Sequence, residues 1–284
     1  MHGSLDPNPV RADPAPRRQR SDGRVRLAVG PIGGATRIRD LAESGPLRLR
    51  FPRGDGALEA VLVNTAGGVA CGDCFSVSLD LEADADLVFT TTAAEKVYRS
   101  DGPDSRIGNA VTLGAGARLA WLPQETILFD RARVRRRLDA DLTGDAGLLA
   151  VEIVAFGRAA RGERIAAGLF EDVWRVRRDG RIVYADGFRL DGAIGDLLTR
   201  PAIGGGARAC ATLLDFGPDA EARLEEARGF LDALAPPGIE AAASAWNGHL
   251  AVRALAPAVG PLRSLVGRFL AAYRGLPMPR VWQS

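Results

Sequence analysis

Much of the chain alternates between apolar and polar residues with a period of two, the pattern of a β-strand that buries one face. Residues 47–51 and 75–81 show this alternation most clearly. Residues 174–184 repeat it on both sides of Asp179-Gly180, a dipeptide that favours a tight hairpin turn. The pattern therefore predicts a mainly β protein.

Three segments share an internal repeat of strand, small polar turn and strand. Leu87, Leu119 and Leu148 occupy equivalent positions in the repeat, 32 and 29 residues apart. Regular units of this size are typical of stacked architectures. We therefore expect hairpins stacked side by side into a layered β structure. The three segments are residues 77–89, 110–122 and 138–151.

Helical spacing replaces the alternation in the last third of the chain. Apolar residues three or four positions apart predict one helix from Ala220 to Leu234, with Asp219 as its N-cap. A second helix is predicted over residues 259–273. The predicted fold is thus a layered stack of β-hairpins or strands with two C-terminal α-helices packed on it. Two short strands are expected between the helices, at residues 241–246 and 249–255.

The two ends of the chain differ in character. Residues 1–23 are rich in proline and arginine and lack the apolar segment of a secretory signal, so we expect a disordered arm. Residues 24–284 are expected to form one β-rich domain. No apolar run approaches the roughly 18 residues that span a membrane. An odd number of cysteines also favours a reducing compartment, so the predicted location is the cytoplasm.

Composition and charge narrow the classes of function. The chain has 284 residues, 46% of them hydrophobic, and its 37 basic and 35 acidic residues give a net charge of +2. A near-neutral balance argues against bulk nucleic-acid binding, so the basic run of residues 131–137 is interpreted as a solvated or partner-facing strand. With two histidines, no nucleotide loop and no convincing nucleophile–base pair, the sequence does not predict an enzyme.

Cys71 and Cys74 have the C-x-x-C spacing of zinc and redox sites. A closed zinc site needs four ligands, and only Cys210 and His249 remain as plausible further soft donors. Packing as small hydrophobic side chains is the simpler interpretation. The alternative function that stays open is a stand-alone zinc-binding or redox β-protein that uses Cys71 and Cys74.

Oxygen donors recur after the repeated strands. Each repeat is followed by an acid and an aromatic residue, and Glu163 lies on a glycine-flanked loop. Carboxylates and hydroxyls can bind a divalent cation weakly and reversibly, so these residues are candidates for a metal site. The alternative interpretation is that the acids form ordinary ion pairs with arginine. The acid–aromatic pairs are Glu95 with Tyr98, Glu125 with Phe129, and Glu152 with Phe156.

Four stretches, NTAGGVACGD, TTAAEKVYRS, WLPQETILFD and RGE, resemble in this order the UreD family of urease accessory proteins, also called UreH. The resemblance runs from about Arg24 to the PRVW near the end. It implies a mainly β, cytoplasmic, non-enzymatic maturation factor. Such a factor binds the urease apoprotein and recruits UreF and the GTPase UreG, which together deliver nickel to the urease active site.

The resemblance also implies that nickel passes through the protein in transit, without a tightly bound cofactor. A conduit should use several weak oxygen sites, because a tight site would trap the ion. The chain departs from the family pattern at Cys71-Gly72-Asp73, where Gly-Gly-Asp is common, so the two thiols are an alternative metal site with Cys74. The candidates for the nickel path are Thr91, Glu95, Glu125, Asp130 and Glu163.

Overall fold

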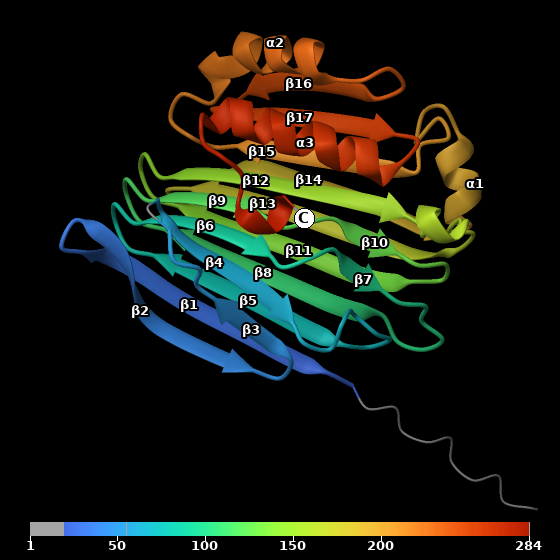
Figure 1. Cartoon of the computed structure of the whole chain (residues 1–284), viewed down its shortest axis with the longest axis horizontal. Helices are drawn as coiled ribbons and strands as arrows, with labels where there is room; N and C mark the ends of the chain where they lie inside the picture. The colour runs from blue at the N-terminus through green and yellow to red at the C-terminus, as the bar shows by residue number, and fades with distance from the viewer. Residues whose placement is uncertain (1–19, 55, 284) are drawn as a thin grey trace, which may run out of the picture.

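Two β-sheets stack face to face, and helices cover part of the outer side of one of them (Figure 1). The computed structural model describes residues 20–54 and 56–283. Sheet A has seven strands in the order β14-β13-β11-β8-β5-β1-β2. They are β1 (Asp22–Ile32), β2 (Ala35–Ser44), β5 (Cys74–Leu81), β8 (Ser105–Leu113), β11 (Arg133–Leu142), β13 (Gly168–Arg178) and β14 (Arg181–Gly192).

Sheet B has ten strands, most of them in the order β16-β17-β15-β12-β9-β6-β4-β3. The short strands β7 and β10 belong to the same sheet, where β10 pairs with both β7 and β12. The mainly β architecture confirms the predicted fold class. The strands are β3 (Leu47–Arg50), β4 (Leu58–Asn64), β6 (Asp86–Thr91), β7 (Glu95–Val97), β9 (Arg118–Leu122), β10 (Thr126–Leu128), β12 (Gly147–Phe156), β15 (Ala209–Asp215), β16 (Glu240–Trp246) and β17 (His249–Ala256).

The repeated units cross from one sheet to the other. β5 leads into β6, β8 into β9, and β11 into β12, and each unit pairs in parallel with the next one. Leu87 aligns with Leu119, which aligns with Leu148, so the predicted stacking is confirmed. The prediction of hairpins was wrong for these units. The two strands of a unit bury their apolar faces against the same core from opposite sheets, so they do not pair with each other.

The turns between the sheets also stack. The backbone N–H of Gly116 donates to Asp145 Oδ1 at 2.7 Å, and that of Gly144 donates to Asp179 Oδ1 at 2.9 Å. Gly116 has a φ of 70°, and a Cβ atom there would lie 2.2 Å from Asp84 Oδ1. The positive φ favours glycine at this turn, and any larger residue would also have to displace the Asp84 side chain.

Apolar residues form two cores on opposite sides of sheet B. The first core lies between the sheets and contains Leu148, whereas the second lies under the helices and contains Val151. These residues are three positions apart on β12, so they point to opposite sides of the strand. A strand buried on both faces has apolar residues at nearly every position. The central strand β12 follows this pattern, whereas apolar and polar residues alternate in outer strands such as β3.

The two predicted C-terminal helices pack on the outer face of sheet B, as expected (Figure 1). Helix α3 (Val259–Arg274) contacts β12, β15 and β17, and helix α2 (Leu224–Leu234) contacts β16 and α3. Helix α2 begins after the position predicted, because Glu221–Arg223 form a 3-10 turn and Asp219 does not cap it. The six-residue helix α1 (Ile194–Thr199) was not predicted.

At the N-terminus, β1 begins at Asp22, so the last two residues of the predicted arm belong to a strand. Residues 1–19 of the predicted arm lie outside the described residues. In the parts of the chain that are described, no helix is both long enough and apolar enough to cross a membrane.

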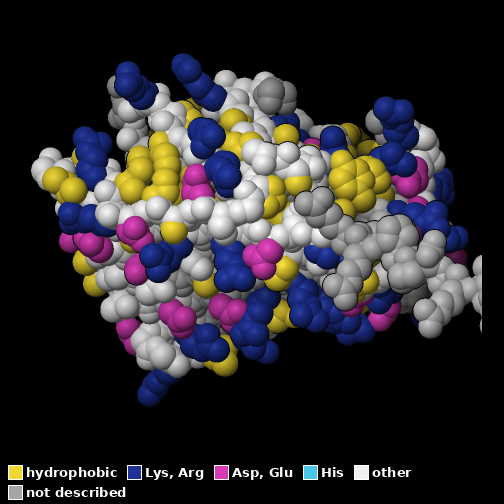
Figure 2. Space-filling model, turned by 90° about the horizontal axis from the view of Figure 1, so that it is seen from below, with side chains coloured by type: hydrophobic (Ala, Val, Ile, Leu, Met, Phe, Trp, Pro, Cys, Tyr) yellow, Lys and Arg dark blue, Asp and Glu magenta, His cyan; other side chains and the backbone are white. Residues whose placement is uncertain are grey.

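Charged side chains of both signs lie interspersed on the face shown in Figure 2. Arg26 pairs with Asp40 at 2.9 Å on the β1–β2 hairpin. In the predicted basic run, alternate arginines share the outer face of β11, as expected, and Arg135 pairs there with Asp104 and Glu171. Arg136 lies between them in sequence and points the other way, into the protein.

Candidate functional site: a charged cluster between the sheets

Two paired strands of sheet A and one strand of sheet B each place one charged residue on the face that lies between the sheets. Arg136 lies on β11, Glu152 on β12 and Asp172 on β13, and the residues two positions away on each side are apolar and buried. Their side chains are only 6%, 14% and 13% exposed. Because buried charges are costly unless they are paired, the arrangement of these three groups needs an explanation.

The guanidinium of Arg136 holds the two carboxylates together. Its Nη1 lies 2.5 Å from Glu152 Oε2, and its Nη2 lies 2.7 Å from Asp172 Oδ2. Nη1 also donates to Thr126 Oγ1 at 2.8 Å, and the group lies 5.0 Å from the centroid of the Phe170 ring. Arg136 is thus fixed by contacts from both sheets.

The cluster contains one more acid than base. Burial raises the pKa of Glu152 to about 7, although the charge of Arg136 opposes the shift. Glu152 Oε2 has an ion-pair contact but no hydrogen-bond donor of good geometry among the described residues, and Arg136 Nε has no acceptor. A buried carboxylate with unused hydrogen-bonding capacity favours the arrival of a proton or a cation.

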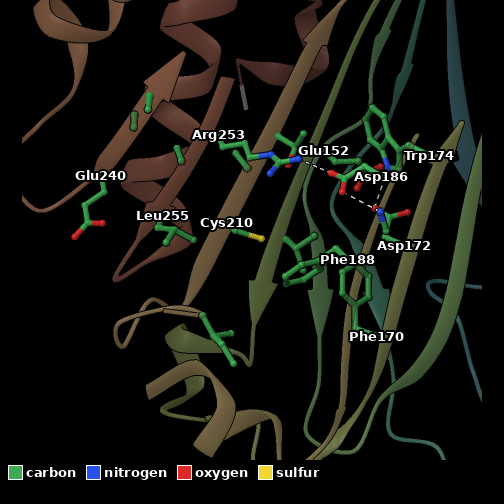
Figure 3. Close-up of a pocket in the computed structure, with 18 of the residues that line it drawn as sticks. Glu152, Phe170, Asp172, Trp174, Asp186, Phe188, Cys210, Glu240, Arg253 and Leu255 are labelled. Atoms are coloured by element: carbon green, nitrogen blue, oxygen red, sulfur yellow. Dashed lines mark hydrogen bonds and ion pairs between the residues drawn. The ribbon is translucent and has the colours of Figure 1, made fainter. Parts of the chain in front are cut away.

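A cavity of about 550 Å³ opens beside the two carboxylates (Figure 3). Glu152 and Asp172 line it together with Cys210 of β15, and the partly exposed Phe188 and Ile203 also contribute to its wall. Burial raises the pKa of the Cys210 thiol to about 12, so the sulfur stays protonated at neutral pH. The carboxylates are therefore the donors that are ready to bind a cation, whereas the thiol would first have to release its proton.

Among the predicted candidates, Glu95 and Glu125 lie at the junction of β7 and β10. The backbone N–H of Glu95 donates to the carbonyl oxygen of Glu125 at 2.9 Å. Asn64 Nδ2 lies 3.3 Å from both carboxylate oxygens of Glu95, and burial raises the pKa of Glu95 to about 7. The two acids are therefore close in the fold but differ in surroundings.

Glu125 is held by the C-terminal helix. Its Oε2 lies 3.2 Å from Nε of Arg263 on α3, and Arg263 also donates to Gln124 Oε1 at 3.0 Å. Gln124 donates its backbone N–H to Thr91 Oγ1 at 2.9 Å. Thr91 and Glu125 thus belong to one polar network that joins sheet B to α3.

Asp130 and Glu163 form a second pair, at the end of β10. The backbone N–H of Asp130 donates to Glu163 Oε1 at 3.1 Å, and Asp130 Oδ1 accepts from the N–H of Ala166 at 2.7 Å. A hydrogen bond from Arg158 lowers the pKa of Glu163 below its usual value. Arg158 also lies 4.2 Å above the Phe129 ring. This pair orders the loop that follows β12.

The two cysteines have different surroundings. Cys71 is buried and its Sγ donates to the carbonyl oxygen of Pro103 at 3.6 Å, whereas Cys74 is exposed at the start of β5. Asp73 between them accepts backbone N–H groups from Ser21 and Ala70 at 2.9 and 2.8 Å. Within residues 20–54 and 56–283, no group of three or more His, Cys, Asp or Glu residues could hold a metal ion.

The structure thus places the predicted acids in two separate regions: Glu95 and Glu125 meet through their backbones, with their carboxylates at different partners, and the Glu163 carboxylate accepts from the backbone of Asp130. The roles of Arg136 and Asp172 were not predicted, and Glu152 was noted only for its place in the repeat. A signal was available in each case, because each charged residue interrupts the apolar positions of an alternating strand. Only the register of β11 with β13, and the packing of β12 against them from the other sheet, shows that they meet.

Replacing Glu95 by glutamine is expected to stabilise the protein by about 2 kcal/mol at pH 8 and by little at pH 4.5. Because its folded pKa is raised to about 7 from 4.5, the folded state binds the proton more tightly than the unfolded state. The wild-type carboxyl group therefore destabilises the fold increasingly as the pH rises from about 4.5 to about 7. Urea denaturation at several pH values measures this; equal gains at both ends of the range would contradict it.

The fold and the site show what class of protein this is. It is a β protein of two stacked sheets, with a pair of carboxylates buried beside a cavity. A comparison with protein families matches residues 21–283 to the family described as UreD urease accessory protein. The chain therefore belongs to the UreD urease accessory protein family, which confirms the resemblance of its motifs.

Individual relatives agree with this assignment. The chain is 73% identical over 288 residues to "Urease accessory protein UreD 1" of Methylobacterium radiotolerans, with 100% of each chain covered. It is 65% identical over 277 residues to "Urease accessory protein UreD 2" of Methylorubrum populi, covering 95% of this chain and 93% of the relative. The "Urease accessory protein UreD" of Xanthobacter autotrophicus is 56% identical over 277 residues, with 98% and 95% covered.

Proposed function

We propose that this protein is a non-enzymatic factor in the maturation of urease. It binds the urease apoprotein in the cytoplasm, recruits UreF and UreG, and passes nickel toward the urease active site. The family match over residues 21–283 is the observation that carries this proposal. The carboxylates beside the cavity support the part that concerns nickel, because oxygen donors bind divalent cations reversibly.

We propose a nickel path that uses acids of sheet B and of the cavity. β7, β10 and β12 are neighbours in sheet B; Glu95 lies on β7, Glu152 lies on β12, and Glu125 immediately precedes β10. Nickel binds strongly to nitrogen and sulfur ligands, and a site built from thiolates would hold it too firmly for relay. Thr91, Asp130 and Glu163 act in this proposal as supports that order the surrounding backbone.

A strain of a urease producer that lacks this protein is expected to make urease that is poor in nickel and inactive. Nickel content and activity of the purified urease measure this, in medium with limiting nickel and in a host without a second copy of the gene. Expression of the wild-type chain from a plasmid is the control, and it should restore both quantities. Normal nickel content and activity in the deletion strain would refute the proposal.

The alternative, a stand-alone zinc or redox protein, makes a different prediction for the same material. It requires stoichiometric zinc that survives dialysis of the purified chain, or a reversible change in the oxidation state of Cys71 and Cys74. Metal analysis and thiol titration of the dialysed protein separate it from a conduit, which releases its ion.

A further inference from the structure

Arg136 lies behind the two acids that line the cavity. It contacts Glu152 and Asp172 at 2.5 and 2.7 Å, whereas the cavity wall is formed by the acids themselves. Arg136 Nε is buried without an acceptor among the described residues. Hydrogen bonds alone therefore do not explain why an arginine occupies this buried position. An arginine placed in this way acts on the cavity through the charge that it brings to the two carboxylates.

We propose that Arg136 sets the affinity of this cavity for divalent cations, by offsetting one of the two negative charges of Glu152 and Asp172, which are two of the acids that line it. With Arg136 present, the cluster of Arg136, Glu152 and Asp172 carries a single net negative charge, which attracts a cation but holds it weakly. Elsewhere in the cavity wall, Asp186 is already paired with Arg253 at 2.5 Å, and Glu240 adds a further carboxylate. Arg136 is therefore a positioning residue that keeps the site reversible. The relevance to nickel rests on the proposed function, whereas the effect on cation affinity does not.

Electrostatics in the protein interior support this role. A unit charge a few ångströms from a cation contributes several kcal/mol at the dielectric constant that suits buried sites. Without Arg136, Glu152 and Asp172 would meet in a buried space with two negative charges. Both carboxylates contact the same planar guanidinium, so a cation that takes its place would be attracted by both of them.

The surroundings prevent Arg136 from leaving this place. Arg136 on β11 pairs in register with Asp172 on β13. From the opposite sheet, Thr126 of β10 accepts a hydrogen bond from the Arg136 guanidinium. The Phe170 ring lies 5.0 Å from the guanidinium carbon. Arginine also keeps its charge at every pH at which the protein folds, whereas a buried lysine would lose it readily. The counter-charge is thus permanent.

The test is the binding of Ni²⁺ to the purified full chain, measured by isothermal titration calorimetry at pH 8. The Arg136→Met variant is expected to bind Ni²⁺ at least about tenfold more tightly than the wild type. Adding Glu152→Gln to this variant should return the affinity to the wild-type range. Arg135→Met is the matched control, since this neighbour lies on the outer face of β11 and should leave the affinity unchanged.

A folded Arg136→Met variant that binds Ni²⁺ no more tightly than the wild type would overturn the proposal, as would an equal gain in Arg135→Met. If Arg136→Met does not fold, the single variant Glu152→Gln decides the question. It leaves Asp172 paired with Arg136 in a cluster without net charge, so Ni²⁺ binding should weaken by about tenfold, and unchanged binding would overturn the proposal.

Urease activation separates this inference from the proposed function. In a strain that carries Arg136→Met, activation is expected to fall while the complex with urease still forms, because the ion is retained. Tighter binding of Ni²⁺ with unchanged activation would support the role of Arg136 in affinity and contradict nickel transit through this cavity.

Discussion

Replacing Phe269 by alanine is expected to lower the free energy of unfolding by about 3–5 kcal/mol. Phe269 on α3 is only 2% exposed, and it belongs to the core between the helices and sheet B. Its ring stacks on Tyr273 at 5.4 Å and meets the edge of Phe230 at 6.3 Å. The substitution removes these contacts and leaves a cavity that helices packed on a rigid sheet cannot close.

Chemical denaturation of the variant and the wild type measures this difference. Leu276→Ala is the control, because Leu276 is 56% exposed just beyond the same helix and its loss should change stability by less than about 0.5 kcal/mol. Equal stability of Phe269→Ala and the wild type would show that the helix does not depend on this contact.

Neutralising one acid of the predicted path is expected to lower urease activation by about tenfold, whereas removing both cysteines should leave at least partial activation. Glu95→Gln and Glu125→Gln are suitable changes, since each keeps the size of the side chain and an oxygen acceptor. The matched variant is Cys71→Ala with Cys74→Ala. A relay of weak oxygen sites loses a step when a carboxylate is neutralised but does not need the thiols.

Urease activity in the complemented deletion strain gives the result, with co-purification of urease and UreF as the check that the complex is intact. Loss of activation in the cysteine variant, with the complex still formed and the acid variants active, would contradict the oxygen path. The metal would then pass through sulfur.

The sequence alone predicted most of the architecture because local pattern and fold agree along much of the chain. The alternation at residues 75–81 corresponds to β5, and Asp179-Gly180 forms the turn between β13 and β14. The helical spacing at residues 259–273 corresponds to α3. In these elements the buried face is set by period alone, so no distant partner is needed to identify it.

Pairing between the strands could not be predicted in the same way. Residues 77–89 fit a hairpin as well as a crossing between two sheets, because both place alternate apolar residues on one face. The difference depends on neighbours such as β8 and β9, which pair with β5 and β6 about thirty residues later in the chain. Pairing between strands so far apart in the chain depends on the packing of all the stacked units. The local sequence of one unit therefore does not predict it.

For the candidate site, the sequence determined which residues carry suitable chemistry, and the tertiary structure decided which of them meet. The motifs identified the family and singled out Glu95, Glu125 and Asp130, but not their separation into two regions. Only the register of β11 and β13, with β12 facing them from the other sheet, brings Arg136, Glu152 and Asp172 together. The physical reason is that side-chain chemistry is local, whereas burial and the distances between charges arise from packing of strands far apart in the chain.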